Sequence, residues 1–440
     1  MPTPDILNPR ALRLLAPLIV FAALFAVLAA LNPSDTAPTL TPSSDSVDQP
    51  LATAGTAAQI EALRRATQID PGDAATATAL GDAYYQRSRE TRDPRFYARA
   101  ERAYDSALAT APEDPGALSG LATIALARHD FSGGLELARR AKAAAPGQVF
   151  PYSALVDALI ETGRYRAAER ALDRMVTLKP NLAAYSRISY FRELHGDLDG
   201  AARALRLAIS AGAGTSEGTA FVRTLLGDLE AKRGRNGAAE RLYREALAID
   251  PRVGATSGLA ALDAGRGELA SAIRGFRGQV GQPPSPDALT DLAEAEQAAG
   301  RLDAARRHYA AAGARERRLL ALGSNVDAGL TLFEADHGDA SRAVSYGRGA
   351  WRNSPSVSSA DAYSWALYRA GRIEAASRLS AEAMRLGSRE PEFLFHAGMI
   401  ARRAGETDRA RRLLTTLLDQ APQWSPLHAP RASSALHGLG

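Results

Sequence analysis

The sequence predicts an all-α protein, a superhelical solenoid of about ten helix-turn-helix units preceded by one N-terminal transmembrane or signal helix. Three observations predict this fold class. A small residue recurs about every 34 positions, amphipathic helical patterns flank each recurrence, and an uninterrupted apolar run stands near the N-terminus. Paired helices of this kind stack, because each pair leaves an apolar face that only its neighbours can cover.

The register is set by the turn that joins the two helices of each unit. Glycine predominates there, because a tight turn between helices needs a residue that accepts positive φ without a Cβ penalty. The turn positions are His129, Gly163, Gly196, Gly234, Gly267, Gly300, Gly338, Gly371 and Gly405. Five residues after each turn stands an alanine, or Gly134 in the first case, so the second helix can approach the first closely.

Each first helix also carries a large residue followed by a smaller one shortly before the turn, as in Leu155-Val156 and Leu226-Gly227. We expect the large residue in the core and the smaller one at a close helix contact. Prolines close many units, because proline cannot extend a helix. These are Pro112, Pro146, Pro180, Pro251, Pro284, Pro355 and Pro422.

The pattern resembles the tetratricopeptide repeat (TPR). The first unit carries Leu80-Gly81, Tyr84, Tyr85, Ala100, Tyr104, Ala107 and Pro112 at the family's positions. About seven extra residues around Glu90 predict a longer turn inside this unit. The resemblance covers residues 57 to about 424 and implies the TPR fold, but it implies no chemistry. More narrowly, Phe395–Met399 and Gln423–Pro430 resemble a group of bacterial membrane-anchored or exported TPR proteins of unassigned activity.

Composition narrows the classes of function. The chain of 440 residues has no cysteine, which removes disulfides, thiol catalysis and cysteine-bound zinc. Its formal net charge is +4, and the basic residues are spread over many units without a dense lysine and aromatic stripe. We therefore expect no nucleic-acid partner.

The N-terminal region predicts the compartment. Residues 14–31 are 18 consecutive apolar residues, which as a helix cover roughly 27 Å of the ~30 Å hydrocarbon layer. Arginines precede this run, so residues 1–13 are predicted to be cytoplasmic and the repeats extracytoplasmic. A single-pass membrane protein is favoured. Cleavage near Val27–Ala29 is the alternative, and it would make the protein secreted or periplasmic.

The rest of the chain divides by composition. Residues 32–56 are rich in Pro, Ser and Thr and are predicted to be a disordered linker. The solenoid is predicted over 57–424, with an N-terminal capping helix over 57–70 that resembles the second helix of a missing unit. Residues 425–440 are predicted to be a C-terminal tail.

No catalytic, cofactor or metal motif is recognisable, so we predict a protein that is not an enzyme and needs no cofactor. Two His-Gly-Asp sequences, at His195–Asp197 and His337–Asp339, favour helix capping by aspartate over metal binding. The terminal histidines His396, His428 and His437 leave metal binding open as an alternative.

The surface of the first helices is the candidate binding site, since arrays of this kind bind partners along a concave groove. A row of small hydroxyls follows it, including Ser186, Thr224 and Thr290. The C-terminal third adds aromatic residues and arginines, the types enriched at binding hot spots. The predicted groove residues are Asp361, Trp365, Tyr368, Arg369, Phe395, His396, Met399, Arg402 and Arg403. Packing of Trp365 and Phe395 against neighbouring repeats is the competing interpretation.

We therefore predict a membrane-tethered TPR scaffold that binds a protein or peptide partner in its concave groove. The alternative is an assembly or accessory factor for an envelope complex or transporter, with metal handling by the terminal histidines. Enzymatic catalysis is the third hypothesis, and no constellation of residues supports it.

Overall fold

The computed structural model describes residues 55–91, 93–212, 217–280 and 285–439. These residues form helices joined by short connections, and no strand occurs among them. They divide into two compact units, an N-terminal unit of residues 55–179 and a C-terminal unit of residues 180–439. The predicted all-α fold of repeated helix pairs is confirmed.

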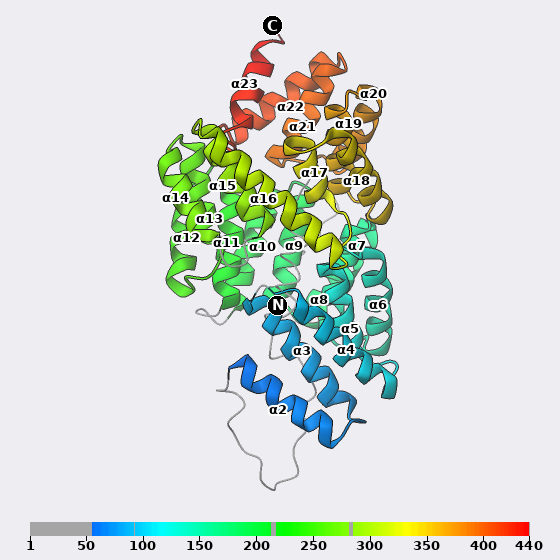
Figure 1. Cartoon of the computed structure of the whole chain (residues 1–440). Coiled ribbons are helices and arrows are strands. Elements are labelled where there is room, and N and C mark those ends of the chain that lie inside the picture. The colour runs from blue at the N-terminus through cyan, green and yellow to red at the C-terminus, as the bar shows by residue number, and fades with distance from the viewer. Residues whose placement is uncertain (1–54, 92, 213–216, 281–284, 440) are drawn as a thin grey trace. The chain divides into compact units, whose positions relative to one another are not determined.

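In the N-terminal unit a single helix precedes three helix pairs, and the helices of each pair pack against each other (Figure 1). The single helix, α2, packs on α3 through Ile60 and Leu63. The bounds are α2 Thr56–Ile69, α3 Ala74–Thr91, α4 Arg95–Thr110, α5 Pro115–Ala127, α6 Phe131–Ala144, α7 Phe150–Glu161 and α8 Tyr165–Leu178.

In the C-terminal unit seven helix pairs are followed by a closing helix, α23, which packs on α21 and α22. Odd-numbered helices up to α21 are the first helices of their pairs. The bounds are α9 Leu182–Leu194, α10 Leu198–Ala211, α11 Glu217–Lys232, α12 Asn236–Ile249, α13 Ala255–Gly265, α14 Leu269–Gln279, α15 Pro286–Ala298, α16 Leu302–Ala321, α17 Ala328–His337, α18 Ala340–Asn353, α19 Val357–Arg369, α20 Ile373–Ala383, the 3₁₀ turn η2 Met384–Leu386, α21 Pro391–Arg403, α22 Thr407–Gln420 and α23 His428–His437.

The turns inside the pairs follow the predicted register. Seven of the predicted glycines have positive φ, and His129 takes the same conformation at φ 60°. Gly338 differs, with φ −123° and ψ −137°. A Cβ there would lie 2.0 Å from a Glu334 carboxylate oxygen, so the Glu334 side chain would have to move.

A tyrosine from the second helix packs against the small residue of the large-and-small residue pair on the first helix. Tyr243 on α12 packs where a Cβ on Gly227 or Gly258 would come within 2.5 Å of its ring. Its hydroxyl donates to Asp228 Oδ1 at 2.7 Å, and burial raises the pKa of Asp228 to about 6. The close helix contact predicted from Leu226-Gly227 is thus a seat for a buried aromatic ring.

The N-terminal unit repeats this arrangement. Tyr104 packs against Gly81 and Gly120 and donates to Asp82 Oδ1 at 2.8 Å. The extra residues near Glu90 lengthen α3, which runs for 18 residues, instead of forming the longer turn predicted from the sequence. Helix-favouring residues and the Arg87–Glu90 ion pair of 3.0 Å account for this difference.

Residues nearly 190 positions apart meet inside the C-terminal unit. The side-chain amide of Gln420, at the end of α22, donates to the carbonyl oxygens of Lys232 and Arg389, both at 2.8 Å. The ammonium of Lys232 lies 2.9 Å from Glu390 and 3.4 Å from Glu193. We call this set of contacts the closing contact, because it joins the α11–α12 turn to the last helix pairs.

The closing contact is close-packed and largely buried. A Cβ on Gly234 would lie 2.2 Å from the carbonyl oxygen of Gln420, so only glycine fits at this turn. Burial raises the pKa of Glu193 to about 7, against the opposing effect of Lys232. Burial alone would lower the pKa of Lys232, but Glu390 and Glu193 raise it above its usual value. The ammonium therefore stays charged between its carboxylates.

The predicted segments 1–13 and 14–31 lie outside the described residues, as does nearly all of the predicted linker 32–56. Within the described ranges, no helix is both long and apolar enough to cross a bilayer. The longest, α16, has 20 residues but carries several arginines, because helices of this array bury one stripe and turn the other to water. This finding overturns the membrane localisation predicted from the sequence.

Candidate functional site

The predicted groove residues lie on two neighbouring first helices of the C-terminal unit. Helix α19 carries four of them and α21 carries the other five. Asp361, Trp365, Phe395 and His396 are at most 1% exposed, and Met399 is also buried. Tyr368 is half-buried, whereas Arg369, Arg402 and Arg403 are exposed. Most of the predicted aromatic residues therefore form the floor beneath a surface.

Stacked rings build this floor. Trp365 stacks between Tyr368, at 4.7 Å between ring centroids, and His396, at 4.2 Å. Phe395 stacks on His428 of the closing helix α23 at 4.8 Å, with 9° between the ring planes. Packing on both faces fixes the rotamer of each ring, so the floor is rigid.

Asp336, the penultimate residue of α17, ties the floor to the surface. The indole N–H of Trp365 donates to both carboxylate oxygens of Asp336 at 3.1 Å. The guanidinium of Arg369 forms an ion pair with the same carboxylate. Asp336 therefore holds a surface arginine and a buried tryptophan in one position.

Beneath this surface lies a buried acid and histidine pair. His396 Nδ1 lies 2.7 Å from Asp361 Oδ2. Burial alone would lower the pKa of His396, but the Asp361 carboxylate raises it above its usual value. Burial also raises the pKa of Glu392, one turn before His396, to about 8. The charged form of His396 is thus favoured by its neighbours.

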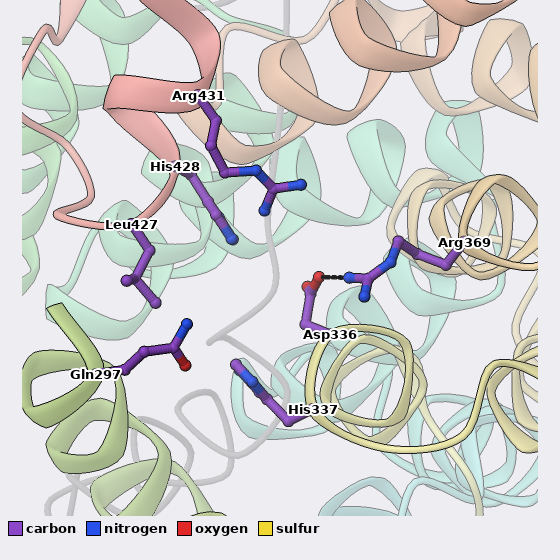
Figure 2. A pocket seen from close by; sticks show the side chains of 7 residues that line it. All are labelled: Gln297, Asp336, His337, Arg369, Leu427, His428 and Arg431. Carbon is purple, nitrogen blue, oxygen red and sulfur yellow. Dashed lines mark hydrogen bonds and ion pairs between the residues drawn. The ribbon is translucent and has the colours of Figure 1, made fainter. Parts of the chain in front are cut away.

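A cavity of about 340 Å³ opens above the floor. Four helices contribute to it, namely α15, α17, α19 and α23. Figure 2 shows that the polar ends of several side chains converge on the hollow from different helices. The lining residues are Gln297, Asp336, His337, Arg369, Leu427, His428 and Arg431.

Nitrogen groups dominate the cavity wall. Arg431 lies over the Phe395 ring, 5.4 Å from its centroid, and forms no ion pair or hydrogen bond with another described residue. Gln297 Oε1 accepts the Tyr309 hydroxyl at 2.9 Å, which leaves the Gln297 amide nitrogen free to donate. Burial lowers the pKa of His428 to about 4, so its imidazole is neutral near pH 7.

Of the seven lining residues, sequence reasoning predicted Arg369 as a binding residue, named His337 and His428 only in other roles, and missed the other four. Asp336 and Gln297 stand at ordinary positions near helix ends and carry no motif. His428 and Arg431 belong to α23, and Leu427 is the residue immediately before it, in the region predicted as a tail. The resemblance of Gln423–Pro430 to other repeat proteins, and the terminal histidines His428 and His437, pointed to this segment.

The terminal histidines do not gather into one site. His396 is paired with Asp361, and His437 Nδ1 contacts the carbonyl oxygen of Ser433 at 2.8 Å. Across the described ranges, no group of three or more His, Asp or Glu side chains is placed to hold a metal ion. The aspartates of the His-Gly-Asp sequences cap helices as predicted: Asp197 accepts from Gly200 N–H and Asp339 from Arg342 N–H.

The predicted row of hydroxyls makes local hydrogen bonds. Ser186, Thr224 and Thr290 each donate to the carbonyl oxygen four residues earlier in their own helices, at 2.8, 3.1 and 3.1 Å. Such bonds are common for hydroxyl residues within helices. These hydroxyl protons are therefore already donated to backbone carbonyl oxygens of their own helices.

Comparison with known proteins identifies the repeat. A family model described as tetratricopeptide repeat matches residues 92–149, 153–216 and 364–423. These matches fall on helix pairs with the glycine turns and proline ends described above. The chain is a tetratricopeptide-repeat protein. TPR proteins are scaffolds for interactions between proteins and are generally not catalytic.

Solved structures with similar helical arrays share little sequence with this TPR protein. A human IFIT1 dimer with PPP-AAAA is 16% identical, with a TM-score of 0.44, and the match covers 79% of this chain and 72% of that one. The human IFIT1 dimer with m7Gppp-AAAA is 15% identical, with a TM-score of 0.47 and coverage of 74% and 76%. The APC/C hetero-tetramer Cut9-Hcn1 is 12% identical, with a TM-score of 0.37 and coverage of 87% and 93%.

No curated protein sequence matches the TPR chain. The narrower resemblance to exported bacterial members of the family stays a prediction.

Proposed function

We propose that this TPR protein is a non-enzymatic scaffold that binds a peptide segment of a protein partner over α19, α21 and α23. One side chain of the peptide enters the cavity lined by Arg369, His428 and Arg431. The observation that carries the proposal is the convergence of donor groups above a rigid, fully buried aromatic floor, with Arg431 unpaired in the described part of the chain. Pockets that orient a ligand combine such a floor with a few polar groups.

The predicted groove residues have two roles in this proposal. Arg369 contacts the peptide directly, and Tyr368 borders the entrance. Trp365, Phe395 and His396 hold the surface in place from below, together with Asp361 and Met399. Arg402 and Arg403 are exposed at the end of α21 and contact the peptide outside the cavity.

Preorganisation supports this assignment. The Asp336 carboxylate fixes Arg369, and the ring of Phe395 supports Arg431. Ordering these long side chains before binding reduces the entropy that association must overcome. Arginine beside buried aromatic rings is also the usual composition of a binding hot spot.

The test begins with selection of a phage-displayed random peptide library on the full-length chain. Affinities of the recovered peptides are then measured by calorimetry for wild type, Arg431→Ala and Leu427→Trp. We expect both variants to weaken binding by at least about tenfold, or 1.4 kcal/mol, because one removes a donor and the other fills the cavity. Arg431 has no ion pair to lose, so its removal leaves the fold intact.

The matched control is Arg348→Ala with Arg352→Ala, two exposed arginines of α18 that do not line the cavity. The pair Arg402→Ala and Arg403→Ala tests the predicted contacts outside the cavity. Peptides that bind Arg431→Ala and Leu427→Trp as tightly as wild type would reject this site. A library that returns no binder would reject the function itself.

A further inference from the structure

A second cavity, of about 420 Å³, lies in the N-terminal unit. Residues from α2, α3 and α4 line it, and these three helices are neighbours at the start of the repeat array (Figure 1). It belongs to a different unit from the cavity under α23, so an inference about it does not depend on the proposed function.

The floor of this groove is apolar. It is formed by Ala77 and Leu80 of α3 and Ala103 of α4, all of them buried. Packing of Ile60 and Leu63 of α2 against this layer holds the first helix in place. An apolar strip between two helices is the kind of surface that an amphipathic helix covers.

The walls carry three arginines, Arg64 from α2 and Arg99 and Arg102 from α4, and no lining residue in the described ranges is acidic. Arg64 is paired with Glu61 at 2.8 Å. Arg99 and Arg102 have no ion pair within the described part of the chain. The pKa of Asp93 is lowered chiefly by its hydrogen bonds with Arg95, and the more distant positive charge of Arg99 lowers that pKa further. Two guanidinium groups at the groove therefore lack a carboxylate of their own.

Arg99 is positioned rather than free in solvent. Its guanidinium lies 4.9 Å from the centroid of the Phe96 ring. That ring contacts Tyr84, which borders the groove, at 6.3 Å between centroids. The cation–π contact orders the arginine before any ligand arrives.

We propose that this groove binds an acidic amphipathic peptide helix, with its apolar side chains on Leu80 and its carboxylates on Arg99 and Arg102. Charge complementarity selects the carboxylates, since guanidinium binds them through paired hydrogen bonds. A free phosphate leaves the apolar floor uncovered. A flat bilayer surface does not reach a floor that lies between two helices.

The probe is a fluorescein-labelled peptide of about 16 residues, roughly 24 Å as a helix, with leucine at helical spacing and glutamate at the flanking positions. Fluorescence anisotropy with the full-length chain measures its affinity. The same peptide with glutamine for every glutamate, and with lysine for every glutamate, tests charge. We expect at least about tenfold weaker binding of the glutamine peptide, no binding of the lysine peptide, and weakening with salt.

Two variants test the site. Arg99→Glu with Arg102→Glu reverses the charge, and Ser106→Trp fills the groove from an exposed lining position while leaving the arginines intact. Each is expected to weaken the glutamate peptide at least about tenfold. The control is Arg166→Ala with Arg170→Ala, two exposed arginines of α8 outside the groove, and it should bind like wild type.

Several outcomes overturn the proposal. Binding that is indifferent to the variants places the peptide elsewhere. A second outcome is that the peptide does not bind, whereas inorganic phosphate, or vesicles of phosphatidylserine and phosphatidylcholine, binds in a manner that depends on Arg99 and Arg102. That result would show that the two arginines recognise phosphate groups. Equal loss in the α8 control shows only non-specific charge attraction. Circular dichroism confirms that each variant is folded, so a loss of binding is interpretable.

Discussion

His396 on α21 and Asp361 on α19 form a buried pair, with 2.7 Å between Nδ1 and Oδ2. The residues are one repeat apart and both are fully buried, so the pair joins two neighbouring first helices inside the core. The Trp365 ring stacks on the imidazole of His396, with 4.2 Å between the ring centroids.

Stability should depend on pH through this pair. The folded state raises the pKa of His396 above the unfolded value of about 6.5, so the folded state holds this proton more tightly. The contribution is complete below pH 6.5 and is lost as pH rises through the folded pKa. We expect urea unfolding of His396→Gln to lack this loss between pH 6 and pH 9. Parallel curves for wild type and variant would contradict it.

His428 should give the opposite dependence. Burial lowers its pKa to about 4, so its contribution to stability is present above pH 6.5 and is lost as pH falls through the folded pKa. The loss is complete only below about pH 4 and is of the order of 3 kcal/mol, most of it reached by pH 4.5. Unfolding free energies of wild type and His428→Phe at pH 7.5 and 4.5 measure it. His437→Gln, at an exposed position, should behave like wild type at both values.

Lys232→Met should destabilise the C-terminal unit by about 3 kcal/mol or more, because it leaves Glu193 and Glu390 buried without their cation. Urea unfolding measures the change. The control is Lys142→Met in the N-terminal unit, where the lysine is half-exposed and has no ion pair in the described part of the chain. A Lys232→Met protein as stable as the control would show that the closing contact is not energetically important.

Gly234→Ala separates the closing contact from ordinary turn strain. Gly234 and Gly371 both have positive φ, 70° and 76°. A Cβ on Gly234 meets the Gln420 carbonyl at 2.2 Å, whereas one on Gly371 meets nothing within 4 Å. Gly371→Ala should cost about 1 kcal/mol, and Gly234→Ala clearly more. Equal losses in thermal unfolding would show that the contact with Gln420 adds nothing to the cost of substituting Gly234.

The repeat register was predictable because it is local. A turn glycine, an alanine five residues later and a closing proline act within one helix pair, and each is visible in about 34 residues of sequence. The packing of Tyr243 against Gly227 is also local, because both residues belong to one helix pair. The length of α16 is local as well, because no proline interrupts Leu302–Ala321.

The candidate site was predictable only in part. Helical phase places Trp365 and Phe395 on the inner side of their helices, but burial depends on what covers that side. The cover comes from His428 and Arg431 of α23, and Asp336 and Gln297 come from other repeats. Contacts between units distant in sequence leave no periodic signal, so pattern reasoning does not find them.

The meeting of the α11–α12 turn with Gln420 also limits how this gene can evolve. Open arrays gain and lose repeats readily, because each unit touches only its neighbours. Here an inserted or deleted helix pair between Gly234 and Gln420 would move Gln420 away from the α11–α12 turn. It would also leave Lys232 without its carboxylate partner at the other end of that stretch. The copy number of that stretch is therefore fixed by geometry, while pairs outside it remain free to vary.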